Sequence, residues 1–365
     1  MTDSTGTRLP SLTGLRFVAA GMVFGFHASI EGVFADPGTS AAVGQAFSRA
    51  GFFGVEFFFV LSGFILTWTA RRDDTRRGFW GRRARKIYPN HVVTWAVAIL
   101  LALWAGQAVG WQVLPNLLLV HAWAPVPEVL NSANIVAWSL ACEVLFYALF
   151  PVLHAGIRRI RVDRLWWWAG GVVALVFTMP LIAQSLPADP QVPTPGGPMS
   201  FYAIWFVYLF PPTRVLEFVL GMFVARIVRD GRWTPPSLGV AGLVAGLAYL
   251  AAFTVPYLYC KVAIALVPLA LVIASAAAAD ARGAFSPFRS RGMVWLGEIS
   301  FAFYLLHWLV LVHGHRLLGT TWGLLGGAAV LALALAVTVL LSWALHVTVE
   351  RPLTRPKQHT DLPAR

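Results

Sequence analysis

The stretch GVEFFFVLSGFILTW, from Gly54 to Trp68, is apolar except for Glu56 and two hydroxyl residues. Together with its flanking residues it forms an apolar run over 51–69, nearly the 20 residues that a helix needs to cross a bilayer core of about 30 Å. An ionised carboxylate inside such a helix costs several kcal/mol unless it is paired or hydrated. The stretch therefore predicts a membrane span, and it raises the question of what Glu56 does there.

The whole chain repeats this pattern. Of its 365 residues 58% are hydrophobic and only 12% are charged, and it contains 16 Trp. We therefore expect an all-α, polytopic transmembrane helical bundle: a single integral-membrane domain over 1–365, with a short cytoplasmic tail at 348–365. We expect about ten spans, at 13–30, 51–69, 88–107, 136–156, 164–184, 203–228, 236–256, 260–279, 296–318 and 324–347.

The formal net charge of +12 is concentrated in every second break between spans. That alternation is the signature of membrane topology rather than of nucleic-acid binding, and it predicts a multi-pass protein of the cytoplasmic membrane with both termini in the cytoplasm. The basic residues in these breaks are Arg71, Arg72, Arg76, Arg77, Arg82, Arg83, Arg85, Lys86, Arg158, Arg159, Arg161, Arg164, Arg226, Arg229, Arg232, Arg282, Arg289 and Arg291.

Three further features are less regular. The segment 111–124 is apolar but short and contains a proline, so we expect a re-entrant or interfacial segment. The Pro/Gly-rich segment 185–200 predicts an extracytoplasmic loop. The two cysteines, Cys142 and Cys260, form neither a disulfide framework nor a metal-ligand pattern, so no metal site is expected.

Arg16 and His27 share the first predicted span. Their separation of eleven residues is three helical turns plus about 20°, so both side chains lie on one face, about 16 Å apart along the axis. Arg16 lies near the cytoplasmic end and His27 in the outer half. The alternative is a snorkelling arginine beside an unrelated buried histidine.

Other ionisable groups fall at the depth of His27. Glu56 and Glu143 lie about 8–10 Å inside the outer face, and Arg214 and Glu217 flank the outer start of the sixth span. Because unpaired charges at this depth are so unfavourable, we expect a shared polar cavity. His307 shares a helix face with Ser300 and Tyr304, which fits either a hydrogen-bonded packing residue or a cavity-lining group.

The cytoplasmic run RRDDTRRGFWGRRARKIYP has two interpretations. It is an anchor that contacts anionic lipid headgroups, or a guanidinium cluster suited to phosphate groups. Charge density alone does not distinguish them. The run ends at Pro89, where we expect the next span to begin.

Seven blocks in order give the chain a resemblance to a known family. They are RFVAAGMVFGFH, GFFGVEFFFVLSGFIL, RRARKIYP, WSLACEVLFY, EFVLGM, ISFAFYLLHW and VERP. The chain resembles the membrane acyltransferase-3 family, whose patterns include an Arg and a His with ten residues between them, here Arg16 and His27, and an Arg-x-x-Arg motif. It departs from many relatives at Val144, where they carry an acidic residue, and at Leu309, where they carry a proline.

The resemblance implies an O-acyltransferase that uses cytoplasmic acyl-coenzyme A as co-substrate, with acetyl as the default acyl group, and modifies a hydroxyl of a carbohydrate or glycosylated acceptor. No bound cofactor is expected. The resemblance assigns donor binding to Arg16, Arg82 and Arg85. The predicted acceptor-side cavity comprises Glu56, Trp138, Tyr147, Arg214, Glu217 and His307.

We expect His27 to act as general base on the acceptor hydroxyl, and Glu143 to orient its ring as the acid does in hydrolytic triads. Tyr147 or Arg214 is a candidate to stabilise the oxyanion. Acylation of His27 before transfer is an alternative. Glu56 either contacts the acceptor or the histidine, or pairs with Arg214.

The main rival function is a transporter or flippase for a glycan or lipid-linked intermediate. The sequence has no visible inverted repeat and predicts no pair of broken helices, which disfavours that function. Consumption of acyl-coenzyme A separates the two. A scaffold without chemistry leaves the aligned Arg16 and His27 unexplained.

Overall fold

The chain is described by a computed structural model that covers residues 8–71, 74–319 and 321–354. Over these residues nine helical segments are long and apolar enough to cross a membrane, and a shorter apolar helix joins them. The first half consists of α1 Pro10–Ile30, α2 Pro37–Phe47, α3 Ala50–Trp68, α4 Arg76–Trp104, α5 Val113–Leu117, η1 His121–Trp123, α6 Pro127–Leu130, η2 Ile135–Ala137, α7 Trp138–Arg159, η3 Val162–Arg164 and α8 Leu165–Ala183. The second half consists of β1 Gln191–Val192, β2 Met199–Ser200, α9 Phe201–Ile204, the π-helix η4 Trp205–Leu209, α10 Pro211–Arg229, α11 Leu238–Ala251, α12 Tyr257–Val262, α13 Leu266–Ala281, η5 Pro287–Arg289, α14 Arg291–Leu318, α15 Leu324–Leu345, the π-helix η6 His346–Glu350 and α16 Arg351–Thr354.

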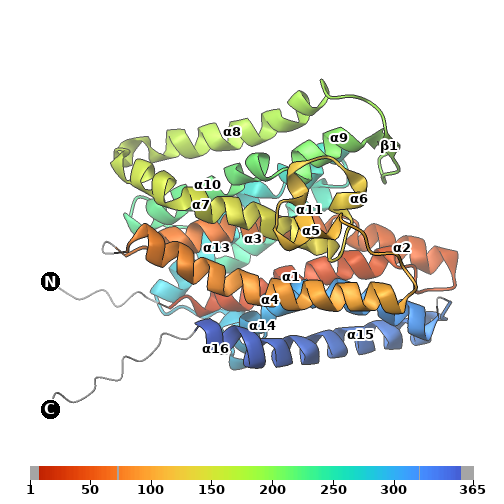
Figure 1. The fold of residues 1–365 in the computed structure, drawn as a ribbon. Coiled ribbons are helices and arrows are strands. Elements are labelled where there is room, and N and C mark those ends of the chain that lie inside the picture. Colours follow the sequence, from red (N-terminus) through yellow and green to blue (C-terminus); the bar gives the residue numbers. More distant parts are fainter. Residues whose placement is uncertain (1–7, 72–73, 320, 355–365) are drawn as a thin grey trace, which may run out of the picture.

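The long helices run side by side, and α1 begins at the same end of the bundle as α16 (Figure 1). The prediction of an all-α bundle is therefore confirmed. Helices α3 and α13 are largely buried, whereas α15 in blue and α8 in yellow-green lie on opposite sides with much of their apolar surface exposed. Exposed apolar helix faces of this kind suit a hydrocarbon solvent.

Glycines bring the inner helices into backbone contact. A Cβ built on Gly63 of α3 would stand 1.9 Å from the carbonyl oxygen of Phe218, and one on Gly221 of α10 would stand 2.0 Å from that of Val60. In the same way Gly297 of α14 packs against Thr13 of α1, at 1.9 Å. Small residues allow such close approach between membrane helices. These contacts fix α3 against α10, and α1 against α14. The first pair carries Glu56, Arg214 and Glu217, and the second carries His27 and His307.

Helix α4 starts earlier than predicted. The sequence suggested a span from residue 88, because Pro89 was taken as a helix start, but the helix begins at Arg76 and contains Pro89 in its interior. Thr75 caps it, with its hydroxyl accepting a hydrogen bond from the backbone N–H of Gly78 at 3.1 Å. Most of the basic run is thus helical.

Two of the predicted spans are interrupted, contrary to the expectation of unbroken helices. The span 203–228 breaks at Phe210, where η4 ends and two prolines open α10. The span 260–279 breaks between α12 and α13. Proline lacks the N–H needed to continue a helix. Irregular backbone at membrane depth is tolerated where protein surrounds it, and both breaks border the buried charged groups described below.

Three other segments contain only short elements. The segment 111–124 holds only the short helices α5 and η1. Strands β1 and β2 form a small antiparallel hairpin within 185–200, with Gln191 opposite Ser200. The predicted span 236–256 contains α11, whose 14 residues reach about 21 Å, less than the bilayer core.

Candidate active site

His27 of α1 and His307 of α14 form a hydrogen-bonded pair in the bundle. The Nδ1 atom of His27 lies 2.8 Å from Nε2 of His307, and their ring centroids are 5.0 Å apart. His307 is completely buried, and its Nδ1 lies 2.7 Å from the carbonyl oxygen of Tyr304. His27 is only partly buried. One imidazole is therefore accessible, and it is held by a second one that is not.

Arg16 lies on the same helix as His27 and lines a small internal cavity of about 50 Å³. Helices α1, α3, α7 and α14 enclose this cavity, which Glu143 and Ser300 also line. Tyr304 connects the cavity to the histidine pair, since its ring lines the cavity and its carbonyl binds His307. A space of this size admits only a few water molecules, so a larger ligand requires its walls to move.

The predicted hydrogen bond between Glu143 and His27 is not present. Among the described residues, Glu143 accepts a hydrogen bond from the Tyr147 hydroxyl, with 3.1 Å between Oε2 and the phenol oxygen. Tyr147 also lies away from the predicted acceptor side, because its ring is under the guanidinium of Arg83 at 5.8 Å. A similar position along two helices does not make their side chains meet, since Glu143 bonds Tyr147 and His27 bonds His307 instead.

Glu56 lies in a second buried cluster with Arg214 and Glu217. Arg214 Nη1 pairs with Glu217 Oε1 at 2.7 Å. Glu56 is completely buried, and neither of its carboxylate oxygens has a hydrogen-bond partner within the described residues. The predicted grouping of these three residues is present. The ion pair, however, joins Arg214 and Glu217 of α10 and does not include Glu56.

Aromatic rings surround this cluster. The ring of Trp138 is 4.8 Å from that of Tyr208, and the Arg214 guanidinium lies 5.1 Å from the Tyr208 centroid. Sequence analysis missed Lys261 of α12, whose ammonium lies 3.9 Å from the ring of Phe52 and 4.5 Å from that of Tyr208. Cation–π contacts stabilise such buried cations. The sequence feature that could have identified this residue is a lysine at the start of an apolar run.

A basic cleft of about 850 Å³ opens at the end of the bundle where α1 begins. It lies between α4 and α7, and Arg82 lines it, whereas Arg85 is exposed on α4 outside the lining. Asp74 also lines the cleft, and a hydrogen bond from the Arg82 guanidinium holds the pKa of that carboxyl below its usual range. The other basic residues of the cleft are Arg71, Arg76, Arg83, His154 and Arg158.

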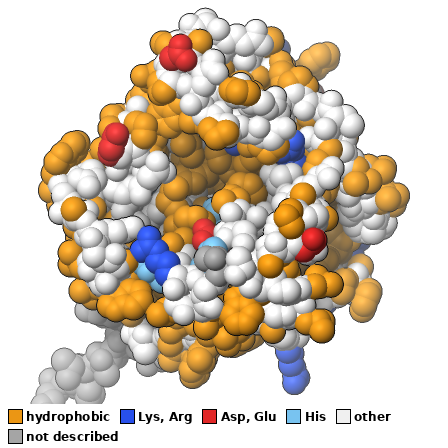
Figure 2. Space-filling view, turned by 90° about the vertical axis from the view of Figure 1, so that its right-hand side faces the viewer, with side chains coloured by type: hydrophobic (Ala, Val, Ile, Leu, Met, Phe, Trp, Pro, Cys, Tyr) orange, Lys and Arg blue, Asp and Glu red, His pale blue; other side chains and the backbone are white. Residues whose placement is uncertain are grey.

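The opposite end of the bundle is hollowed. Figure 2 views this face, and a depression lined mainly by hydrophobic side chains opens at its centre, with acidic and histidine side chains at its edge. The bundle thus has a basic cleft at one end, an apolar depression at the other, and the histidine pair and small cavity inside.

Comparison with known proteins places this arrangement in a family. A family model described as an acyltransferase domain matches residues 9–347, nearly the whole chain. The chain belongs to the acyltransferase-3 family. Together with the long apolar helices, this makes it a multi-pass membrane protein.

Three relatives of this acyltransferase-3 chain differ in their identity to it and in the share of each protein that aligns. Acyltransferase MdmB of Streptomyces mycarofaciens is 41% identical over 360 residues, which is 95% of this chain and 92% of the relative. Exopolysaccharide production protein ExoZ of Rhizobium meliloti is 29% identical and aligns with 83% of this chain and 89% of its own length. Peptidoglycan O-acetyltransferase OatA of Listeria monocytogenes is 22% identical over 83% of this chain and 49% of its own length. No solved structure matches.

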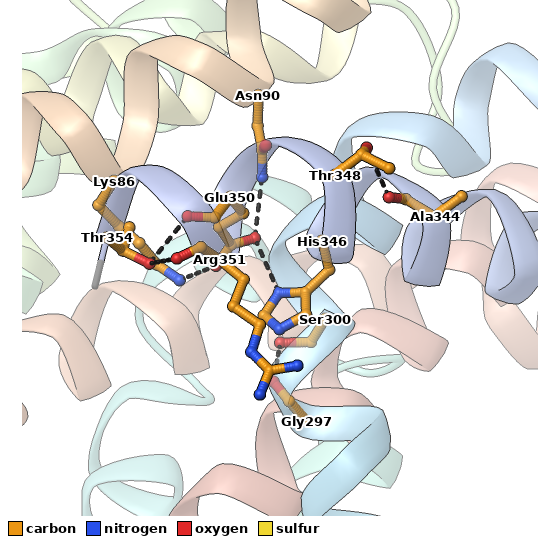
Figure 3. Close-up of polar contacts among 10 residues, drawn as sticks. All are labelled: Lys86, Asn90, Gly297, Ser300, Ala344, His346, Thr348, Glu350, Arg351 and Thr354. Carbon is orange, nitrogen blue, oxygen red and sulfur yellow. Dashed lines mark hydrogen bonds and ion pairs between the residues drawn. The ribbon is translucent and has the colours of Figure 1, made fainter.

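The last motif of the acyltransferase-3 resemblance, VERP, contains a second site that sequence analysis did not single out. Glu350 of η6 is buried and forms an ion pair with Lys86 of α4 (Figure 3). Asn90 donates a hydrogen bond to Glu350 Oε2 at 2.9 Å, and His346 Nδ1 lies 3.4 Å from the same oxygen. These contacts tie the middle of α4, and with it the basic cleft, to the end of the bundle.

Proposed function

We propose that this chain transfers an acyl group, acetyl by default, from acyl-coenzyme A to a hydroxyl of a carbohydrate or glycosylated acceptor, with His27 as general base. The observation that carries the proposal is the accessible His27 imidazole, held by His307 in the interior of an acyltransferase-3 bundle. A neutral imidazole is suited to removing a proton at neutral pH.

The basic cleft supports the donor assignment. Guanidinium groups bind phosphates through charge-assisted, bidentate hydrogen bonds, and the phosphate-rich end of coenzyme A fits a cleft of about 850 Å³. Arg82 and Arg83 would hold these phosphates, and Arg16 lies further along the proposed path, about 16 Å before His27. The cavity beside Arg16 and Glu143 must widen to admit the pantetheine arm. The excess of basic residues at this end supports its placement in the cytoplasm, with both termini.

The acceptor would enter from the other end, through the depression of Figure 2, on the outer face of the cytoplasmic membrane. Glu56 has unused hydrogen-bonding capacity suited to sugar hydroxyls. Two relatives are named for exopolysaccharide production and peptidoglycan O-acetylation, which supports a carbohydrate acceptor. Trp138 and Tyr208 would supply ring faces beside it.

The reaction follows from these positions. His27 Nε2 takes the proton of the acceptor hydroxyl while the hydroxyl oxygen attacks the thioester carbonyl carbon. The tetrahedral intermediate collapses, the carbon–sulfur bond breaks, and the departing sulfur receives the proton from His27. The products are the ester and free coenzyme A, and His27 returns to its neutral form.

The test is acyl transfer from radiolabelled acetyl-coenzyme A by membranes that contain the wild type, His27→Ala or the control His313→Ala, with a host lysate as acceptor pool. Label in a glycan or glycoside with the wild type and the control only would support the proposal. Equal labelling by His27→Ala would exclude His27 as the base.

Two further outcomes discriminate between mechanisms. Label that remains on the protein when acceptor is omitted would support acylation of His27 before transfer. An expressed wild type that consumes no acyl-coenzyme A of any chain length tested would contradict the proposal and favour the transporter.

A further inference from the structure

The carbonyl oxygen of Tyr304 determines the protonation of the two histidines. A carbonyl oxygen only accepts hydrogen bonds, and it lies 2.7 Å from His307 Nδ1. That nitrogen must therefore carry a hydrogen. Because His307 is completely buried, its neutral form is favoured over the imidazolium. A neutral imidazole with a hydrogen on Nδ1 has a lone pair on Nε2.

The lone pair of His307 Nε2 then acts on His27. It lies 2.8 Å from His27 Nδ1, and a hydrogen bond of this length needs a donor on the opposite side. His27 Nδ1 must be that donor, so the lone pair of the neutral His27 ring is on Nε2. We propose that His307 is a positioning residue that fixes His27 in the tautomer whose Nε2 is the base, a role that rests on the proposed function.

The surroundings of His307 make it a rigid support. Its ring stacks on Phe303 with 6.2 Å between centroids and 10° between planes. The residue that holds it, Tyr304, is itself fixed, because its hydroxyl donates to the carbonyl of Val136 at 3.1 Å and accepts from Ser139 at 2.9 Å. A series of hydrogen bonds thus runs from Val136 to Tyr304, from Tyr304 to His307, and from His307 to His27, and each fixes the orientation of the next residue.

A neutral partner has a chemical consequence that a carboxylate would not have. When His27 takes a proton on Nε2, its Nδ1–H still points at a lone pair, and the positive charge is shared across two rings instead of being neutralised by an anion. The imidazolium is less stabilised than beside a carboxylate, so it returns the proton to the departing sulfur more readily.

The experiment compares His307→Leu with His307→Gln. Leucine fills the space without an acceptor, whereas the glutamine amide can accept from His27 Nδ1–H and donate to the Tyr304 carbonyl. We expect kcat of His307→Leu to fall about 100-fold, less than the roughly 10⁴-fold loss when an orienting aspartate is replaced. The KM for acyl-coenzyme A should stay within about twofold, and His307→Gln should recover most of kcat.

Equal losses in the two variants, or a loss in KM alone, would overturn the positioning role. A second readout does not depend on activity: solid-state ¹⁵N NMR of histidine-labelled protein, with His27→Asn used to assign the His27 signals. The expected result is a hydrogen on His27 Nδ1 and none on Nε2, and the reverse would overturn the inference. If the wild type transfers no acyl group, the proposed function fails, and the NMR result alone then decides the tautomer.

Discussion

Glu350 and Glu56 are both buried carboxylates, but their surroundings are opposite. Glu350 is in contact with Lys86, Asn90 and His346, so both its oxygens are occupied. Glu56 is buried more completely and has no hydrogen-bond partner in the described part of the chain. Arg214, a cation of the same cluster, is paired with Glu217.

The difference distinguishes buried polar residues that stabilise the fold from buried polar residues that are available to bind a ligand. Burying a carboxylate without partners is so unfavourable that native structures rarely do it without a reason. A fully partnered group such as Glu350 holds two helices together. Under the proposed function, the acceptor would supply partners to an unpartnered group such as Glu56. The following four experiments test or refine this contrast.

Replacement of Glu350 by leucine should give the largest effect, and the effect should be on stability. Lys86 would keep its charge and lose its partner, which we expect to lower the free energy of unfolding by about 3 kcal/mol. The value is at the lower end for broken buried pairs, because the Lys86 side chain is one-third exposed. Equilibrium unfolding in mixed micelles measures it, with Glu350→Gln as the control that keeps the shape. Unchanged stability of the leucine variant would show that this cluster does not hold α4.

Glu56→Gln should have the opposite profile. No partner is lost, so the free energy of unfolding should be unchanged or raised. If Glu56 binds the acceptor, kcat/KM for the acceptor should fall about tenfold, the upper value for one neutral hydrogen bond. Steady-state kinetics at saturating acyl-coenzyme A gives this number. Lower stability together with unaltered kinetics would place Glu56 with Glu350 as a structural residue.

Arg82→Ala and Arg85→Ala form a matched pair three residues apart on α4. Only Arg82 lines the basic cleft, so its loss should raise the KM for acyl-coenzyme A about tenfold. The KM of Arg85→Ala should change less than about twofold. The Arg82 effect should also shrink at high salt, as expected for partly exposed charges. Equal effects of the two substitutions would indicate a diffuse basic surface rather than a built phosphate site.

Asp74→Asn should give the smallest change. Under the proposed function Asp74 would compete with donor phosphates for Arg82, so its neutralisation should lower the KM for acyl-coenzyme A about two- to fivefold. Because Arg82 holds the pKa of Asp74 below its usual range, the carboxylate is charged above its unfolded pKa of about 3.9. Its interaction is lost only as pH falls through the lower folded value. The gain should therefore be constant between about pH 5 and 8, and a gain that depends on pH in this window would contradict the assignment.

Local sequence patterns were sufficient for much of the fold. Apolar run length located the spans, and both Arg16 and His27 lie on α1, as expected. Interruptions were missed because hydropathy alone does not register the break at Phe210, although Pro211 and Pro212 directly follow it. The start of α4 was missed because a proline was read as a boundary, although helices tolerate it internally.

The partners of the site residues were less predictable. His27 was expected to meet Glu143 because both lie at similar nominal depth, but depth along one helix does not say which neighbour it faces. The close packing of α1 on α14 at Gly297 decides that His307 is the neighbour. Lys261 and Glu350 were visible as charges beside apolar runs, and only the tertiary structure shows that both are buried.

The small cavity beside Arg16 has a consequence for the cell as well as for the reaction. A protein that receives one substrate from each side of a membrane must not let ions or protons flow between the two sides. The space of about 50 Å³ between α1, α3, α7 and α14 admits only a few water molecules, so under the proposed function it would limit the flow of ions past this level. When the pantetheine arm enters, it would occupy the passage that it opens, so that the energy stored in the membrane potential is preserved through each turnover.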